Sequence, residues 1–460
     1  MDWASASEIA RAVANGERSA LAVTEAALGR IKSLNPKLNV FTDVVATRAR
    51  AKARALDQAR GAGQRLGPLA GVPFAVKNLF DIKGLPTLAG SKINRSHVPA
   101  AQDATLIVRL EAAGAILVGA LNMGEYAYDF TGENIHDGAS RNPHDVARMT
   151  GGSSGGSGGA VAGGLVPLAL GSDTNGSIRV PSSFCGIFGL KPTYGRLSRA
   201  HTFPFVASFD HLGPLARTTK DLALAYDAMQ GYDADDPVCA DRPAEPTLLA
   251  LDRGVEGLRI AVAGGYFRRG ASPEASEAME RVAKALDVQR EIEIPEAERA
   301  RSAAYVITAT EGSALHLDRL RSRAKDFDPA VRDRLIAGAM VPAALVNQAQ
   351  KFRRWYRERV LELFKDVDVI LAPATPCTAP KIGQQTFVLD GVEMALRPNI
   401  GIYTQPISFI GLPVVAAPVP LTPLPIAVQI IAAPWREDLT LRVANALEQA
   451  GAASAPRPNI

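Results

Sequence analysis

GGSSGGSGG at residues 151–159 and GSDTNGSIRVP at residues 171–181 are the most unusual stretches of this chain. The segment 151–195 that contains them holds 13 of the 40 glycines in the 460 residues, so glycine is strongly concentrated there. A flexible linker would have a similar composition, but the apolar run Val166–Leu170 has the length of a buried strand. We therefore expect a structured segment in which glycine lets the backbone approach other groups closely.

Two familiar glycine-rich motifs fit the first stretch poorly. A phosphate-binding loop needs Lys-Ser or Lys-Thr after its glycines, and neither follows here. The G-x-S-x-G pattern of a nucleophile elbow is satisfied around Ser153, but that motif needs a buried strand directly before the serine, and residues 142–150 are polar with a proline. It also needs a late histidine, and the last of the six is His316. A serine nucleophile in this chain would need another base.

Lys77 is the candidate for that base. It follows the apolar run Val72–Val76, which predicts a buried strand that delivers the amine to the end of a sheet. Burial disfavours the charged form of a lysine and lowers its pKa from about 10.4 towards neutrality. The alternative is a solvated lysine at a strand end, which is the common role of such a residue.

Together these residues resemble the amidase signature family. The resemblance is carried by the glycine-rich stretch, by Asp-Thr-x-Gly-Ser-Ile-Arg-x-Pro at residues 173–181, and by Val-Lys at the end of the upstream strand. It extends over nearly the whole chain through the flanking stretches 68–79, 121–134, 184–196 and 425–432.

The resemblance implies a triad in which Ser177 is the nucleophile and Ser153, after a cis peptide bond, relays its proton to an uncharged Lys77. It also implies an oxyanion hole of backbone N–H groups at Thr174, Asn175, Gly176 and Ser177. The side chains expected to support the triad are Ser154 and Ser172, as hydrogen-bond partners, and Asp173 and Arg179, as a structural ion pair. The implied reaction is amide hydrolysis through a seryl acyl-enzyme, with no metal and no cofactor.

Two positions depart from the common family pattern. Asn78 follows the lysine where Asp is usual, and Asn175 replaces a glycine. The chain resembles the 1-carboxybiuret hydrolase branch of the family in these departures and in the strings at residues 75–81, 88–95 and 172–177. This resemblance implies a small ureide substrate. It also implies a small partner protein similar to the C subunit of tRNA amidotransferases.

Other functions remain open. The A subunit of glutamyl-tRNA(Gln) amidotransferase is also similar, but its aspartate for the glutamine amino group corresponds to Gly401 here. A general aliphatic or aryl amidase is a further alternative. A catalytically silent scaffold is disfavoured because all three triad positions are intact.

A substrate with a carboxylate would need a cationic or hydrogen-bonding pocket. The candidate substrate-binding residues are Tyr126, Gly152, His316 and Arg319, with Tyr128 and Arg321 as further possibilities. Core packing is an equally good interpretation of the two tyrosines. A solvated helix face is the commoner role for His316 and the two arginines.

The alternation of apolar runs and helical periodicity predicts an α/β fold with a mixed central β-sheet covered by helices on both faces. We expect an N-terminal helical segment at residues 1–62, with Ser5 and Ser19 as helix caps. Residues 63–460 are expected to form the amidase signature domain, with a helical insertion at about 265–365, in one compact unit.

Composition excludes several classes of protein. The formal net charge is +4, from 51 basic and 47 acidic residues without a basic block, so neither nucleic acid nor a membrane is an expected partner. The three cysteines are far apart, which argues against disulfides and a zinc site and favours a cytoplasmic protein. We expect a soluble homodimer, or a heteromer with the small partner protein, that acts on a small molecule.

Overall fold

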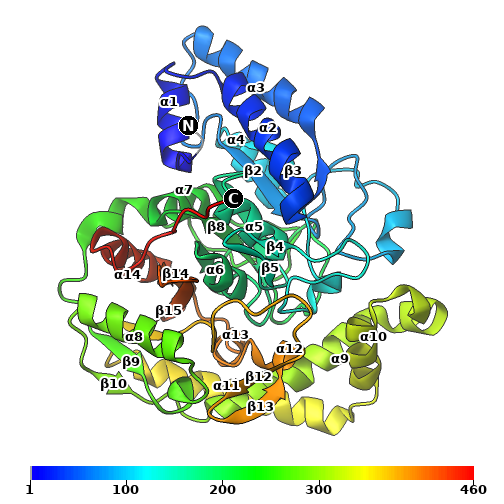
Figure 1. The fold of residues 1–460 in the computed structure, drawn as a ribbon, viewed down its shortest axis with the longest axis vertical. Helices are drawn as coiled ribbons and strands as arrows, with labels where there is room; N and C mark the ends of the chain where they lie inside the picture. The colour runs from blue at the N-terminus through cyan, green and yellow to red at the C-terminus, as the bar shows by residue number, and fades with distance from the viewer. Residues whose placement is uncertain (1–2) are drawn as a thin grey trace.

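The computed structural model describes residues 3–460 and is built around one mixed sheet of 11 strands with helices packed around it (Figure 1). The strands are β1 (Phe41–Val44), β2 (Pro73–Lys77), β3 (Ile116–Leu121), β6 (Leu168–Asp173), β7 (Phe188–Lys191), β8 (His211–Ala216), β9 (Ile260–Ala263), β10 (Glu291–Ile292), β11 (Val369–Pro373), β14 (Val414–Val419) and β15 (Ile426–Ala432). Their order is β1-β3-β2-β6-β8-β7-β14-β15-β11-β9-β10. The pairs β3–β2, β2–β6, β11–β9 and β9–β10 are parallel, and the other pairs are antiparallel. The predicted mixed α/β fold is confirmed.

The remaining elements are helices and two short hairpins. The α-helices are α1 (Ala6–Ala14), α2 (Ala20–Leu38), α3 (Ala46–Gly61), α4 (Thr105–Ala112), α5 (Gly155–Ala162), α6 (Arg179–Cys185), α7 (Thr219–Met229), α8 (Pro273–Ala285), α9 (Ala297–Arg323), α10 (Pro329–Ala339), α11 (Ala343–Leu363), α12 (Leu396–Asn399), α13 (Gln405–Ser408) and α14 (Glu437–Gln449). The hairpins pair β4 (Arg141–Asn142) with β5 (Asp145–Met149), and β12 (Thr386–Leu389) with β13 (Val392–Ala395).

The N-terminal segment begins with two capped helices, as the sequence predicts. Ser5 forms a capping box with Glu8, whose carboxylate accepts the Ser5 N–H at 2.8 Å. Ser19 accepts the N–H of Ala22 at the start of α2. The expectation of an entirely helical segment misses β1, which pairs with β3 in the main sheet. A strand of only four residues leaves little periodicity to recognise in a sequence.

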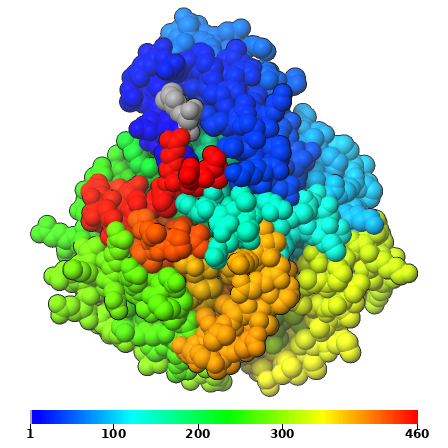
Figure 2. All heavy atoms as spheres, viewed as in Figure 1, coloured from blue at the N-terminus to red at the C-terminus, as the bar shows by residue number. Residues whose placement is uncertain are grey.

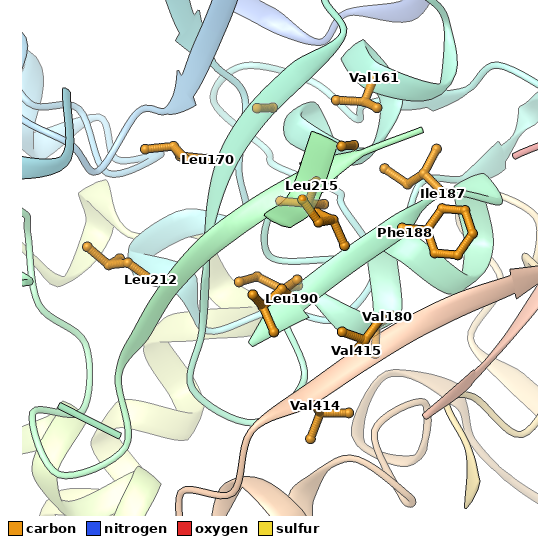
Figure 3. Packing of buried hydrophobic residues seen from close by; sticks show 14 of the residues in the cluster. Val161, Leu170, Val180, Ile187, Phe188, Leu190, Leu212, Leu215, Val414 and Val415 are labelled. Atoms are coloured by element: carbon orange, nitrogen blue, oxygen red, sulfur yellow. The ribbon is translucent and has the colours of Figure 1, made fainter. Parts of the chain in front are cut away.

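Three central strands also escape sequence-based prediction. β7 and β8 contain Gly189, Gly213 and Pro214, and β14 contains Pro418, residues that normally argue against a strand. They are nevertheless fully buried and form the middle of the sheet, where their apolar side chains pack together (Figure 3). The segment at about 265–365, where we expect a helical insertion, is mostly helical. It contains α8 to α11 and the short strand β10, which pairs with β9 at the edge of the sheet.

The main cluster of buried apolar residues extends from Ala6 in α1 to Ala453 after α14. The C-terminal segment lies beside the first described residues at the surface (Figure 2), and the Arg457 guanidinium lies 5.4 Å from the centre of the Trp3 ring. Within residues 3–460, none of the helices has the length and apolar composition needed to cross a lipid bilayer.

Candidate active site

The strands β2 and β6 end at the same edge of the sheet. They are parallel neighbours, with Val76 opposite Leu170, so the residues at their carboxyl ends lie side by side. β2 ends at Lys77, and β6 ends at Asp173 directly after Ser172. This topology brings the lysine amine to the glycine- and serine-rich segment, although residues 77 and 172 are far apart in the sequence.

The Lys77 amine lies among three serine hydroxyls. Its Nζ atom is 2.7 Å from Ser153 Oγ, 2.8 Å from Ser172 Oγ and 3.0 Å from Ser154 Oγ. All of Lys77 is inaccessible to solvent, at 0% exposure. The Ser154 hydroxyl also donates to the backbone carbonyl of Ser172 at 3.1 Å, so it accepts a hydrogen bond from the amine rather than donating one to it.

Burial also decides the charge of this amine. Loss of hydration lowers the pKa of Lys77 to about 7, against the opposing effect of the carboxylates of Asp210, Asp173 and Asp129. A large fraction of Lys77 is therefore uncharged near neutral pH. An uncharged amine has a lone pair that can accept a proton, which an ammonium group lacks.

Ser153 and Ser177 approach this centre from two different segments. Ser153 follows a cis peptide bond from Gly152, just before α5. Ser177 lies in the turn between β6 and α6 and is 2% exposed. Among the described residues, no hydrogen bond joins the Ser177 hydroxyl to Ser153 or Lys77, whereas Ser153 and Lys77 are directly bonded.

The turn that carries Ser177 presents several backbone N–H groups. The Gly176 N–H donates to Asp173 Oδ1 at 2.7 Å, so it is already engaged. Within residues 3–460, no protein group accepts a hydrogen bond from the N–H groups of Thr174, Asn175 and Ser177. Three of the four predicted oxyanion donors are therefore free to bind another oxygen.

A fully buried ion pair holds this turn in place. Arg179 donates to both carboxylate oxygens of Asp173 at 3.0 Å, and both side chains are 0% exposed. Arg179 also donates to Gln429 Oε1 at 2.6 Å and to the Thr404 carbonyl at 3.1 Å. Burial alone would raise the pKa of Asp173, but the adjacent Arg179 holds it well below its usual range.

Comparison with known proteins adds three findings. The family model described as amidase matches residues 22–441. The chain belongs to the amidase signature family. It is 54% identical to AtzE, a subunit of 1-carboxybiuret hydrolase from Pseudomonas sp. (strain ADP), over 97% of this chain and 98% of that protein. It is 38% identical to the A subunit of glutamyl-tRNA(Gln) amidotransferase from Roseiflexus castenholzii, over 95% and 94% of the two chains.

Solved structures agree with this assignment. A chain from a vestigial protein complex, which bears on the evolutionary origins of an s-triazine catabolic enzyme, superposes with a TM-score of 0.98. The two chains share 53% sequence identity, and the match covers 98% of this amidase and 100% of that chain. The predicted family and the prediction that the chain is an amidase, a hydrolase of amide C–N bonds, are confirmed.

The predicted substrate-binding residues of this amidase lie in two places. Tyr126, His316 and Arg319 belong to one cluster, with the Tyr126 and His316 ring centroids 4.0 Å apart and Arg319 Nη1 3.3 Å from His316 Nδ1. His316 is 0% exposed, and burial lowers its pKa to about 3, so its ring is uncharged and lies on no solvated helix face. Arg321 does lie exposed on α9, beside Asp318.

Gly152 lies elsewhere, directly before Ser153. A Cβ atom there would lie 2.4 Å from Asp129 Oδ2, so only glycine fits at this position. The role of Gly152, and of the Tyr126 cluster, in substrate binding stays a prediction.

Sequence reasoning missed two residues near this site. The Arg334 guanidinium lies 3.8 Å from the Tyr128 ring centre and donates to the Ala330 carbonyl at 2.7 Å and to the Tyr128 carbonyl. The half-buried Phe130 packs against Gly401 and Gly176. Neither residue has a distinctive sequence signal, because one is an arginine of α10 and the other an aromatic residue of a loop.

Proposed function

We propose that this amidase hydrolyses a C–N bond of a small ureide similar to 1-carboxybiuret and releases ammonia through an acyl-enzyme on Ser177. The observation that carries the proposal is the fully buried Lys77 amine, with a pKa of about 7, bonded to the Ser153 hydroxyl. The choice of substrate rests on the 54% identity to a subunit of 1-carboxybiuret hydrolase. The proposed chemistry uses protein groups alone.

In the first half of the reaction, the Ser177 oxygen attacks the substrate carbonyl carbon. Its proton passes to Ser153, whose own proton passes to the lone pair of Lys77. The carbonyl oxygen becomes negatively charged and accepts hydrogen bonds from the free N–H groups of the turn that carries Ser177. Because these donors are fixed by the fold, no solvent needs to reorganise as the charge develops.

In the second half, the tetrahedral intermediate collapses and its C–N bond breaks. The proton on Lys77 returns through Ser153 to the leaving nitrogen, which departs as ammonia or an amine. Water then attacks the acyl-enzyme and gives its proton to the same relay, so the acid product leaves and Ser177 is restored. Each proton taken up by Lys77 is returned within one turnover.

Arg334 is our candidate for binding an anionic end of the substrate. It forms no ion pair with a carboxylate of the described residues, so its charge is available to a ligand. Arg334 contacts Tyr128. Two residues after Tyr128, the Phe130 carbonyl accepts the N–H of Gly152, the residue directly before Ser153, at 2.8 Å. A guanidinium group is well suited to a carboxylate.

Glutamine is a less suitable substrate than a ureide. The resemblance to the amidotransferase A subunit implies that an aspartate of that subunit corresponds to Gly401, where this chain has no side chain. A Cβ atom at Gly401 would lie 2.5 Å from the Phe130 ring, so the space for such an aspartate is already filled. A general amidase and a glutamine-hydrolysing A subunit remain the alternatives.

The panel that tests this proposal measures ammonia released from biuret-type ureides with and without a carboxylate, from glutamine, and from simple amides. We expect the carboxylated ureide to give the highest kcat/KM. Activity on glutamine alone would overturn the proposed substrate, and equal rates on all simple amides would favour a general amidase.

Replacing Asn78 with aspartate should change the pH at which the enzyme becomes active. Asn78 is 2% exposed, and its side chain accepts the Gly90 N–H at 3.0 Å. A carboxylate beside Lys77 would stabilise the ammonium form and raise its pKa by about one unit or more. In a pH profile of kcat/KM, the acidic limb of Asn78→Asp should therefore move to higher pH, while Asn78→Ser, which adds no charge, leaves it in place. An unmoved limb in the aspartate variant would refute the effect.

We further propose that the chain acts in the cytoplasm and associates with a second copy or with a small protein similar to the amidotransferase C subunit. Two findings support a partner. The relative in Pseudomonas is itself one subunit of an enzyme, and the superposed structure comes from a protein complex. The described cysteines are all free thiols, which is usual in a reducing compartment.

A further inference from the structure

The Phe130 ring lies where three segments of the candidate active site meet. A Cβ atom built at Gly401 would be 2.5 Å from Phe130 Cζ and 2.7 Å from Cε2. A Cβ atom built at Gly176, the residue before Ser177, would be 3.3 Å from Phe130 Cε1. The tip of the ring therefore faces Gly401, and its Cε1 atom also reaches the turn that carries Ser177.

The backbone around Phe130 is fixed on both sides. Its carbonyl accepts the Gly152 N–H at 2.8 Å, and the preceding Asp129 accepts the N–H groups of Thr131 at 2.9 Å and Gly132 at 2.6 Å. Asp129 also accepts a hydrogen bond from Arg397, which precedes Gly401 by four residues in the sequence. The backbone that carries the ring is thus held in place.

The segment of Gly401 is fixed as well. Thr404 Oγ1 donates to the Asn175 carbonyl at 2.6 Å and to the Gly401 carbonyl at 3.1 Å, so residues 401–404 are bound directly to the turn that carries Ser177. Gly401 cannot move away from this turn without breaking these bonds. The positions of the Phe130 backbone, of Gly401 and of the Ser177 turn are therefore set by the fold.

We propose that Phe130 and Gly401 act as a steric pair that limits the substrate pocket beside Ser177 to narrow, flat acyl groups. The proposal deepens the proposed function and rests on it, because it assumes that Ser177 is the nucleophile. A ureide is planar throughout and needs only the thickness of one conjugated layer. An amide with a branched, tetrahedral carbon next to its carbonyl is wider and collides with the ring.

The first test changes the size of the ring. Phe130→Ala should raise kcat/KM for an α-branched amide such as isobutyramide by about tenfold or more relative to the ureide, since a misfit of one or two methyl groups has about that effect on specificity. Phe364→Ala removes another half-buried phenylalanine, at the end of α11, and should leave the ratio unchanged.

The second test adds a methyl group to the opposing residue. Gly401→Ala should lower kcat/KM for the ureide by about tenfold or more, because a Cβ there overlaps the ring. In the double variant Phe130→Ala/Gly401→Ala that loss should largely disappear. Thermal unfolding curves of all three variants must show them folded at the assay temperature, because relief of the same overlap would also rescue a weakened fold.

The outcomes distinguish this inference from the proposed function. If the wild-type enzyme hydrolyses ureides but Phe130→Ala leaves the size preference unchanged, or the double variant is as poor as Gly401→Ala, the steric pair is wrong and the function stands. If the wild-type enzyme hydrolyses no ureide while Phe130→Ala still gains branched amides, the substrate class is wrong and the steric pair stands.

Discussion

Ser177→Ala is expected to lower kcat on any amide substrate by at least about 10⁴-fold, because removal of a serine nucleophile leaves only binding and oxyanion stabilisation. KM should change little, since the serine is 2% exposed and contributes little binding surface. Ammonia release and trapping of the acyl-enzyme by hydroxylamine provide the two readouts.

The control for this variant is Ser183→Ala, which removes a buried hydroxyl from α6. Ser183 Oγ lies 2.7 Å from Thr375 Oγ1 and belongs to a different group of hydrogen bonds from the Lys77 amine. It should alter stability but not the chemical step. Retention of most of the activity by Ser177→Ala, with trapped acyl groups still formed, would remove Ser177 from the mechanism.

Lys77→Met is expected to lower kcat/KM by about 10³-fold or more, within the usual range for loss of a general base. Methionine has a similar length and no proton to exchange, so the Ser153 relay loses its final acceptor. The variant should still fold because methionine has a similar volume, with some loss of stability because the buried Ser153 and Ser172 hydroxyls lose their partner.

Lys191→Met is the matched control. Lys191 is the other fully buried lysine at a strand end, and burial lowers its pKa to about 7 as well. Its amine donates to the carbonyls of Pro192, at 3.2 Å, and Leu412, and to no serine hydroxyl of the described chain. If both methionine variants lose the same fraction of activity, loss of a buried amine is a structural defect and Lys77 has no special role.

The comparison of these two lysines indicates how far the sequence alone could lead. Lys77 follows an apolar strand and is accompanied by a glycine- and serine-rich motif, so its burial and its neighbours Ser153, Ser154 and Ser172 were predictable, and the structure brings all three hydroxyls to the amine. Lys191 also ends a strand, but Gly189 hides that strand from sequence patterns.

The substrate side of the site was much less predictable. Phe130 and Arg334, which we propose to contact the substrate, lie on segments that meet only in the folded chain, and no local motif marks a loop phenylalanine or a helix arginine. His316 illustrates a further limit, because a histidine whose commoner role is on an exposed helix face is instead enclosed by aromatic rings. Motifs identify groups at fixed backbone positions, whereas pockets depend on long-range packing.

The pH dependence of kcat/KM for the wild-type enzyme tests whether Lys77 must be uncharged for the reaction. Because Lys77 must be neutral to accept a proton and its pKa lies at about 7, the rate should fall about tenfold per pH unit below that value and level off above it. The limb should be absent from the residual activity of Lys77→Met. A rate that stays constant from about pH 5 to about pH 9 would show that no group with such a pKa has to lose its proton, and would contradict the proposed base.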